Sequence, residues 1–232
     1  MKINKNRVKT TTMIGLTALA FTSCASSNKA QKDNVVVKPD NIQNMEDMDN
    51  SYLILSDAQL SAVNKGNTFA LNLFRTQAGM DSKVVSPLSV AYLMGMLANG
   101  AEGNTQTEIM KTLGMNDVSL ETLNEAYKAI INTASTLDKQ TTVNIANCIA
   151  INKNFTLNND FAHTVADSYQ AGVESMDFTS PKSATRINDW CKKQTKGMIP
   201  SIIDQVDPAA VSYLLNAIYF NGIWQEKFDA KN

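Results

Sequence analysis

Residues 211–220 read VSYLLNAIYF, and this stretch decides the fold class. Aromatic and branched side chains fill it, and apolar residues occupy both of its alternating sets of positions. A strand that is apolar on both faces is covered on both sides. The stretch therefore predicts a central strand of a sheet with further layers above and below it, and Asn216 stands in its middle.

Further strands are expected earlier in the chain. Residues 143–151 read VNIANCIAI, an alternation that is typical of a strand, and Asn147 interrupts its apolar set. Residues 173–178 form another candidate strand, and residues 83–85 form a short one.

Local signals mark the helices. Residues 56–59 (SDAQ) and 105–108 (TQTE) have the form of capping boxes, in which two side chains satisfy backbone groups at a helix start. Ser86 followed by Pro87 is an N-cap serine with proline at the first helical position, and Gly114 is placed to end a helix. We expect helices from residue 56 onward and over residues 88–98, 105–113, 120–134, 161–169 and 181–195. Together with the strands, these helices predict an α+β fold.

Composition limits the class of protein. The 232 residues are 44% hydrophobic and 19% charged, which suits a globular domain with a sizeable core. The formal net charge is −1, so the chain lacks the electrostatic signature of a nucleic-acid-binding protein.

The N-terminus resembles a targeting segment. Residues 1–12 are basic, residues 13–21 are apolar, and small residues lead to Cys24. This order predicts a secretory signal peptide over residues 1–23, and its end resembles a bacterial lipobox, in which the cysteine sulfur carries a lipid. The alternative is ordinary secretion with cleavage near Cys24 and no lipid. Polar residues dominate 24–50, which predicts a flexible tether, and the folded domain is expected over 51–232.

The sequence contains no recognisable set of catalytic residues. His163 is the single histidine, and its spacing to Asp160 and Asp167 is that of an ordinary helix surface. Cys148 and Cys191 show no metal-ligand spacing and are expected to be small buried residues, with a disulfide between them as the alternative. The sequence therefore predicts no enzyme, no metal and no cofactor.

Three polar residues lie in apolar surroundings: Ser86, Ser89 and Asn216. A buried hydroxyl or amide without a partner costs about 1–3 kcal/mol. We therefore expect these side chains to meet each other or another polar group in a satisfied network.

Several stretches resemble one family in its own order along the chain. They are residues 67–74 (NTFALNLF), 84–90 (VVSPLSV), 97–105 (LANGAEGNT), 187–190 (INDW), 195–199 (TKGMI) and 215–224 (LNAIYFNGIW). These stretches are similar to the sequence blocks of serpins. The resemblance implies an α+β fold with N-terminal helices packed on a large central mixed sheet, incomplete at the C-terminus of this chain.

The resemblance also implies a function. Serpins inhibit proteases by inserting a cleaved reactive loop into the central sheet. By position, Ser86, Ser89 and Asn216 fall in the shutter, where the sheet parts, and Trp224 falls in the breach, where insertion starts. The reactive loop is expected beyond residue 232. The expected partner is therefore a serine or cysteine protease, outside the cytoplasm, and a non-inhibitory serpin that acts as a carrier or chaperone is the alternative.

Overall fold

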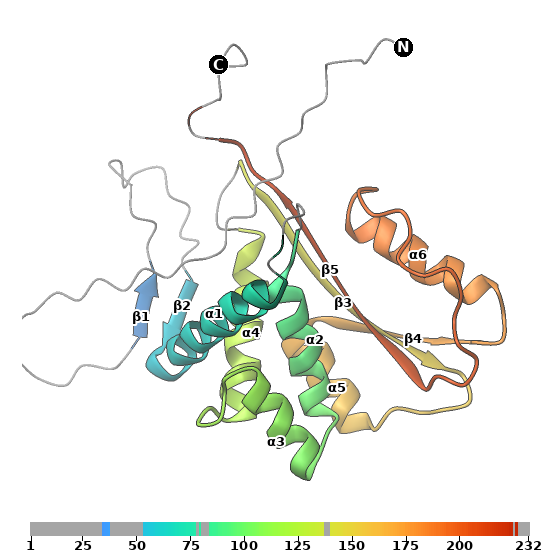
Figure 1. Ribbon diagram of the computed structural model, residues 1–232, viewed down its shortest axis with the longest axis horizontal. Coiled ribbons are helices and arrows are strands. Elements are labelled where there is room, and N and C mark those ends of the chain that lie inside the picture. Colours follow the sequence, from blue (N-terminus) through green and yellow to red (C-terminus); the bar gives the residue numbers. More distant parts are fainter. Residues whose placement is uncertain are drawn as a thin grey trace, which may run out of the picture.

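The structure is a computed structural model that describes the backbone of residues 34–37 and residues 53–77, 79, 84–136, 140–224 and 226. The elements, in chain order, are β1 (Asn34–Val37), β2 (Leu53–Ser56), α1 (Asp57–Gln77), α2 (Pro87–Asn99), α3 (Gly103–Thr112), α4 (Leu120–Ala134), β3 (Thr142–Asn152), α5 (Asn159–Tyr169), β4 (Ala171–Met176), α6 (Lys182–Gln194) and β5 (Ser212–Asn221). Most helices lie on one side of a long sheet, and α6 lies on the other side (Figure 1).

The sheet is mixed, with strand order β4-β3-β5. β3 runs parallel to β4 and antiparallel to β5. The predicted α+β class with helices packed on a mixed sheet is thus confirmed. The expected strands at 143–151, 173–178 and 211–220 are present with slightly shifted bounds.

Two hydrophobic cores flank the sheet, because successive side chains of a strand point to opposite faces. Ile149 of β3 joins the core formed with α2, α4 and α5, where Tyr92 and Leu123 are fully buried. Its neighbour Cys148 joins the second core with Ile187 of α6. Both α2 and α6 contact β5, so helices lie on both of its faces as expected, although only Leu215 and Ala217 of the strand are fully buried. The expected central position is not found in the described sheet, where β5 pairs with β3 alone and stands at the edge.

The helix ends follow their local signals, with one exception. The Ser56 amide donates to Gln59 Oε1 (2.9 Å) and the Gln59 amide to Ser56 Oγ (3.3 Å), which confirms the first capping box. Gly114 has φ +76° and ends α3 as predicted, since its amide donates to the Lys111 carbonyl at 2.9 Å.

The capping box expected at residues 105–108 is wrong. α3 begins at Gly103, whose φ is +58°, and its N-cap Glu102 makes no side-chain capping bond. The Gln106 side chain instead donates to the carbonyls of Ala98 (3.0 Å) and Ala101 (2.9 Å). Glycine tolerates the left-handed conformation, so it starts the helix earlier and Gln106 is free to hold the α2–α3 turn.

One other expectation differs from the structure, and two apolar side chains of α1 are exposed. Val84 and Val85 are not in a strand, so the short strand at residues 83–85 is wrong for the two described residues. On α1, Phe74 is 55% exposed, and Leu71 is 59% exposed. Within the described residues, the C-terminal half of α1 has too little structure beside it to cover these side chains.

A strand lies inside the segment expected to be a flexible tether. β1 pairs antiparallel with β2, and Asn34 faces Ser56 while Val37 faces Leu53. The sequence pattern did not predict this pairing, and the rest of residues 24–50 lies outside the described residues. No helix among the described residues is long and apolar enough to cross a bilayer.

Candidate functional site

The first part of the site is the start of α2. Ser86 caps the helix, with Pro87 as its first residue, as predicted. The Ser89 amide donates to Ser86 Oγ at 3.3 Å, and the two hydroxyl oxygens lie 2.8 Å apart. Ser86 and Ser89 therefore satisfy each other while both are half-buried.

The second part joins the two long strands. Asn147 of β3 and Asn216 of β5 stand opposite each other in the register. Asn216 Nδ2 donates to Asn147 Oδ1 at 2.8 Å, and Asn147 Nδ2 donates to the Tyr169 carbonyl at 2.7 Å. This chain of amides connects β5 through β3 to the end of α5, on the sheet face that α2 covers.

The expected network is therefore split into two pairs. Among the described residues, no hydrogen bond joins Ser86 or Ser89 to Asn216. Asn216 Oδ1 is buried and accepts no hydrogen bond from the described part of the chain. Asn147, which is 4% exposed, is the partner that sequence reasoning missed. Its one signal was a polar residue within an alternating apolar strand, and its partner depends on a register that one strand alone does not reveal.

Three tyrosines fix the position of α2 above these amides. The rings of Tyr92 and Tyr127 have centroids 4.8 Å apart, and Tyr169 meets both of them edge-on. Gly95 allows this close approach, because a Cβ there would lie 2.6 Å from the Tyr169 hydroxyl oxygen. Burial raises the pKa of all three hydroxyls, so the cluster stays uncharged.

A pair of asparagine side chains lies beside the tyrosine cluster and bonds to the Tyr169 hydroxyl. Asn99 Nδ2 donates to Asn124 Oδ1 at 2.8 Å, and Asn124 Nδ2 donates to Asn99 Oδ1 at 2.8 Å. The Tyr169 hydroxyl donates to Asn124 Oδ1 at 2.7 Å. α2, α4 and α5 are thus held together by partly buried polar contacts as well as by ring packing.

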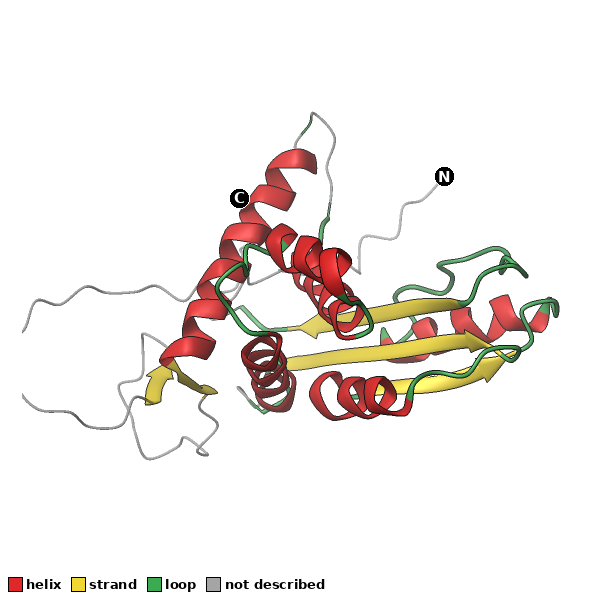
Figure 2. Cartoon of the chain, turned by 90° about the horizontal axis from the view of Figure 1, so that it is seen from below, coloured by secondary structure: helices red, strands yellow, loops and turns green. Residues whose placement is uncertain are grey.

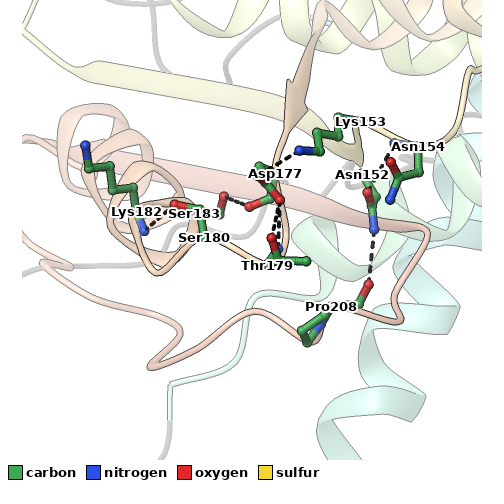
Figure 3. Close-up of polar contacts among 9 residues, drawn as sticks. All are labelled: Asn152, Lys153, Asn154, Asp177, Thr179, Ser180, Lys182, Ser183 and Pro208. Atoms are coloured by element: carbon green, nitrogen blue, oxygen red, sulfur yellow. Dashed lines mark hydrogen bonds and ion pairs between the residues drawn. The ribbon is translucent and has the colours of Figure 1, made fainter.

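Another polar cluster lies at the far end of β3 (Figure 3). Lys153 Nζ donates to Asp177 Oδ2 at 2.8 Å, and Thr179 Oγ1 donates to Asp177 Oδ1 at 2.6 Å. The bond from Lys153, followed by those from Thr179, lowers the pKa of Asp177 to about 2. Asn152 Nδ2 donates to the carbonyls of Pro208 and Ala210, each at 3.2 Å. These contacts secure the turn into α6 and the segment that leads into β5.

The remaining predicted residues are placed as follows. Trp224 lies just past the end of β5 and is 39% exposed. Cys24 lies outside the described residues. Cys148 and Cys191 are buried free thiols, and burial raises the pKa of Cys148 to about 11, so the predicted buried role is confirmed and the disulfide alternative is not.

Groups capable of catalysis do not converge in the described part of the chain. His163 is exposed on α5, as predicted. Among the described residues, no cluster of three or more His, Cys, Asp or Glu side chains could hold a metal ion. The site consists of buried amides, hydroxyls and aromatic rings, which can exchange hydrogen bonds but offer no nucleophile paired with a base.

Comparison with known proteins decides the family. The family model for serpin (serine protease inhibitor) matches residues 64–232. This chain belongs to the serpin family. The recognition from sequence blocks is thus confirmed for the family, and the lipoprotein detail stays a prediction.

Individual relatives agree with this assignment. The serpin chain is 34% identical to Iripin-2 of Ixodes ricinus over 187 residues, covering 77% of this chain and 47% of the relative. It is 34% identical to Serine protease inhibitor 42Dd of Drosophila melanogaster over 149 residues, covering 63% of this chain and 40% of the relative. The chain spans about half the length of the curated relatives it matches.

Solved structures share the fold. The thermophilic serpin Tengpin in its latent state matches with a TM-score of 0.68 and 30% identity, covering 75% of this chain and 47% of Tengpin. Human thyroxine-binding globulin, solved in complex with its hormone, matches with a TM-score of 0.67 and 28% identity, covering 75% of this chain and 48% of the globulin. These matches confirm the predicted serpin-like fold.

Proposed function

We propose that this chain is the N-terminal portion of a protease inhibitor that acts on a serine-type endopeptidase by strand insertion. The observation that carries the proposal is the serpin match over residues 64–232, with relatives named as serine protease inhibitors. The inhibitor itself is no enzyme in this proposal. The target protease supplies the nucleophile, and its acyl-enzyme with the reactive loop is trapped when the loop enters the sheet.

The buried amides give the proposed shutter a physical role. A sheet that opens beside β5 must exchange hydrogen bonds in its interior, and an unmade buried bond is expensive. In this proposal, Ser86 and Ser89 hold the start of α2, and Asn216 is the group whose bond to Asn147 changes as the sheet parts. Trp224, just beyond β5, is proposed to lie in the breach where insertion begins.

The test uses the complete protein, including the sequence that follows residue 232. We expect it to form a detergent-stable complex with at least one serine protease from a panel that also contains cysteine proteases. A complex with a cysteine protease alone would redirect the proposal to that class. Cleavage of the protein by every protease without any complex would contradict inhibition.

A non-inhibitory serpin is the second candidate. It is supported by the similarity to thyroxine-binding globulin, a serpin-fold protein solved with a bound hormone. The same panel separates the two candidates, because a carrier would be cleaved as an ordinary substrate and would form no stable complex.

The proposed location is outside the cytoplasm, in the bacterial cell envelope through a lipid on Cys24, with the extracellular space as the alternative. The basic, apolar and small-residue order of residues 1–23 supports this proposal. Mass spectrometry of the mature protein is expected to give an N-terminal Cys24 carrying several acyl chains, since one chain alone anchors only marginally. A Cys24→Ser variant should leave the membrane fraction. An unmodified N-terminus at another residue, with soluble protein, would contradict the lipid.

A further inference from the structure

The chain enters the folded domain at an unexpectedly early point. Asn34, the first residue of β1, lies opposite Ser56, the last residue of β2. Ser56 also takes part in the capping box that starts α1. The incoming chain is therefore held beside the first turn of α1.

β2 is a secure base for this pairing. Leu53 and Leu55 are 5% and 1% exposed, and β2 contacts both α1 and α4. Gln59, in the first turn of α1, donates to Glu125 of α4 at 3.0 Å. A strand that pairs with β2 is thereby attached to the helices α1 and α4.

The pairing shortens the distance over which a lipid on Cys24 can act. Cys24 lies ten positions before Asn34, so the intervening chain spans at most about 35 Å when fully extended. Without β1, the first anchored residue would be Leu53, and the reach would be about 100 Å. A 35 Å tether is comparable to the size of a small domain, so it restricts orientation, whereas a 100 Å tether does not.

We propose that the β1–β2 pair orients the protein on the membrane, with β2 and the first turn of α1 toward the lipid surface. This inference rests on the proposed lipid at Cys24. The end of the molecule that carries α6 lies away from β1 and β2 in both views, so it points into solution, where a large partner can reach it (Figures 1 and 2).

The described groups near the start of α1 form no basic cluster that could provide this orientation. Asp57 and Glu125 are exposed acids near the start of α1, and Lys65, two turns further along the helix, is partly buried and paired with Asp117 at 2.6 Å. Attraction to an anionic bilayer needs a cluster of basic residues. In this proposal, the short tether holds this end near the lipid.

The test compares two single-cysteine positions in the whole lipid-modified protein, placed in vesicles of phosphatidylethanolamine and phosphatidylglycerol with an acceptor dye on the headgroups. Ile54→Cys on β2 and Lys182→Cys on α6 each receive a donor dye, and both native positions are exposed. Cys148 and Cys191 are buried with raised thiol pKa values, so they react slowly. We expect energy transfer to be several-fold more efficient from position 54 than from position 182.

Breaking β1 should remove the difference. Of two successive residues in β1, one points its backbone N–H toward β2. Replacing both Val35 and Val36 by proline therefore removes this donor in either case. The matched control places prolines at Asn28 and Lys29, before β1, and should keep the difference. Continued protection of Cys148 from labelling would show that the β1 variant is still folded.

Each outcome is informative. Equal transfer from the two positions of membrane-bound wild-type protein would overturn the orientation but leave the lipid intact. An unchanged difference in the folded β1 variant would overturn the role of the β1–β2 pair. Soluble protein in which Cys24 itself reacts with the dye would contradict the proposed lipid modification of Cys24, and this inference with it.

Discussion

Replacing Asn216 by alanine in the complete protein is expected to lower the free energy of unfolding by about 1–2 kcal/mol and to speed polymerisation on mild heating. The change deletes the donor to Asn147 Oδ1, an acceptor on a side chain that is almost fully buried. It also removes Asn216 Oδ1, which has no partner among the described residues, and this relief offsets part of the loss. The net effect should therefore fall in the lower part of the range for a stranded buried group.

Asn147→Ala should cost more than Asn216→Ala, because Asn147 makes two bonds. Its loss strands both Asn216 Nδ2 and the carbonyl of Tyr169. A double-mutant cycle between the two positions should give a coupling of about 1 kcal/mol if the amide pair acts as a unit.

Asn132→Ala is the matched control for the amide pair. Asn132 also makes an amide–amide bond, accepting from Gln170 Nε2 at 2.7 Å, but this pair is exposed. Its loss should change the free energy of unfolding by less than about 0.5 kcal/mol. Thermal melts and polymerisation rates of all variants provide the comparison. An Asn216→Ala protein that melts and polymerises like the Asn132→Ala control would contradict the proposed role of Asn216.

Features encoded by neighbouring residues were predictable from sequence. The capping box at Ser56, the cap at Ser86 and the helix end at Gly114 each depend on contacts within a few residues. The contact of β5 with helices on both faces was also predictable, because a strand that is apolar on both faces has few other stable environments. The serpin blocks then placed these elements in one fold.

Features that depend on distant pairing were not predictable. Asn147 and Asn216 meet only because β3 and β5 pair in one register, and a shift of one residue would turn them to opposite faces. The β1–β2 pair joins two short segments, neither of which has a strong pattern alone. The exposure of Phe74 depends on what covers α1, which its own helical periodicity does not show.

A segment of residues 51–232 produced alone is expected to aggregate and to inhibit no protease. In the described sheet, β5 has β3 on one side and stands at the edge on the other. An apolar edge strand presents unpaired backbone donors and acceptors to other chains. Light scattering and size-exclusion chromatography should show oligomers that grow with concentration, and a protease panel should show no detergent-stable complex.

The competing explanation for such aggregation is the exposed apolar surface of α1. Leu71 and Phe74 are each more than half exposed, so Leu71→Lys with Phe74→Lys removes that surface without touching the sheet. If the edge of β5 drives association, as we expect, this double variant should aggregate at nearly the rate of the unmodified segment. A monodisperse monomer with a cooperative melt would refute the folding half of the prediction. A stable protease complex formed by the segment would refute the functional half, because it would locate inhibitory activity before residue 232.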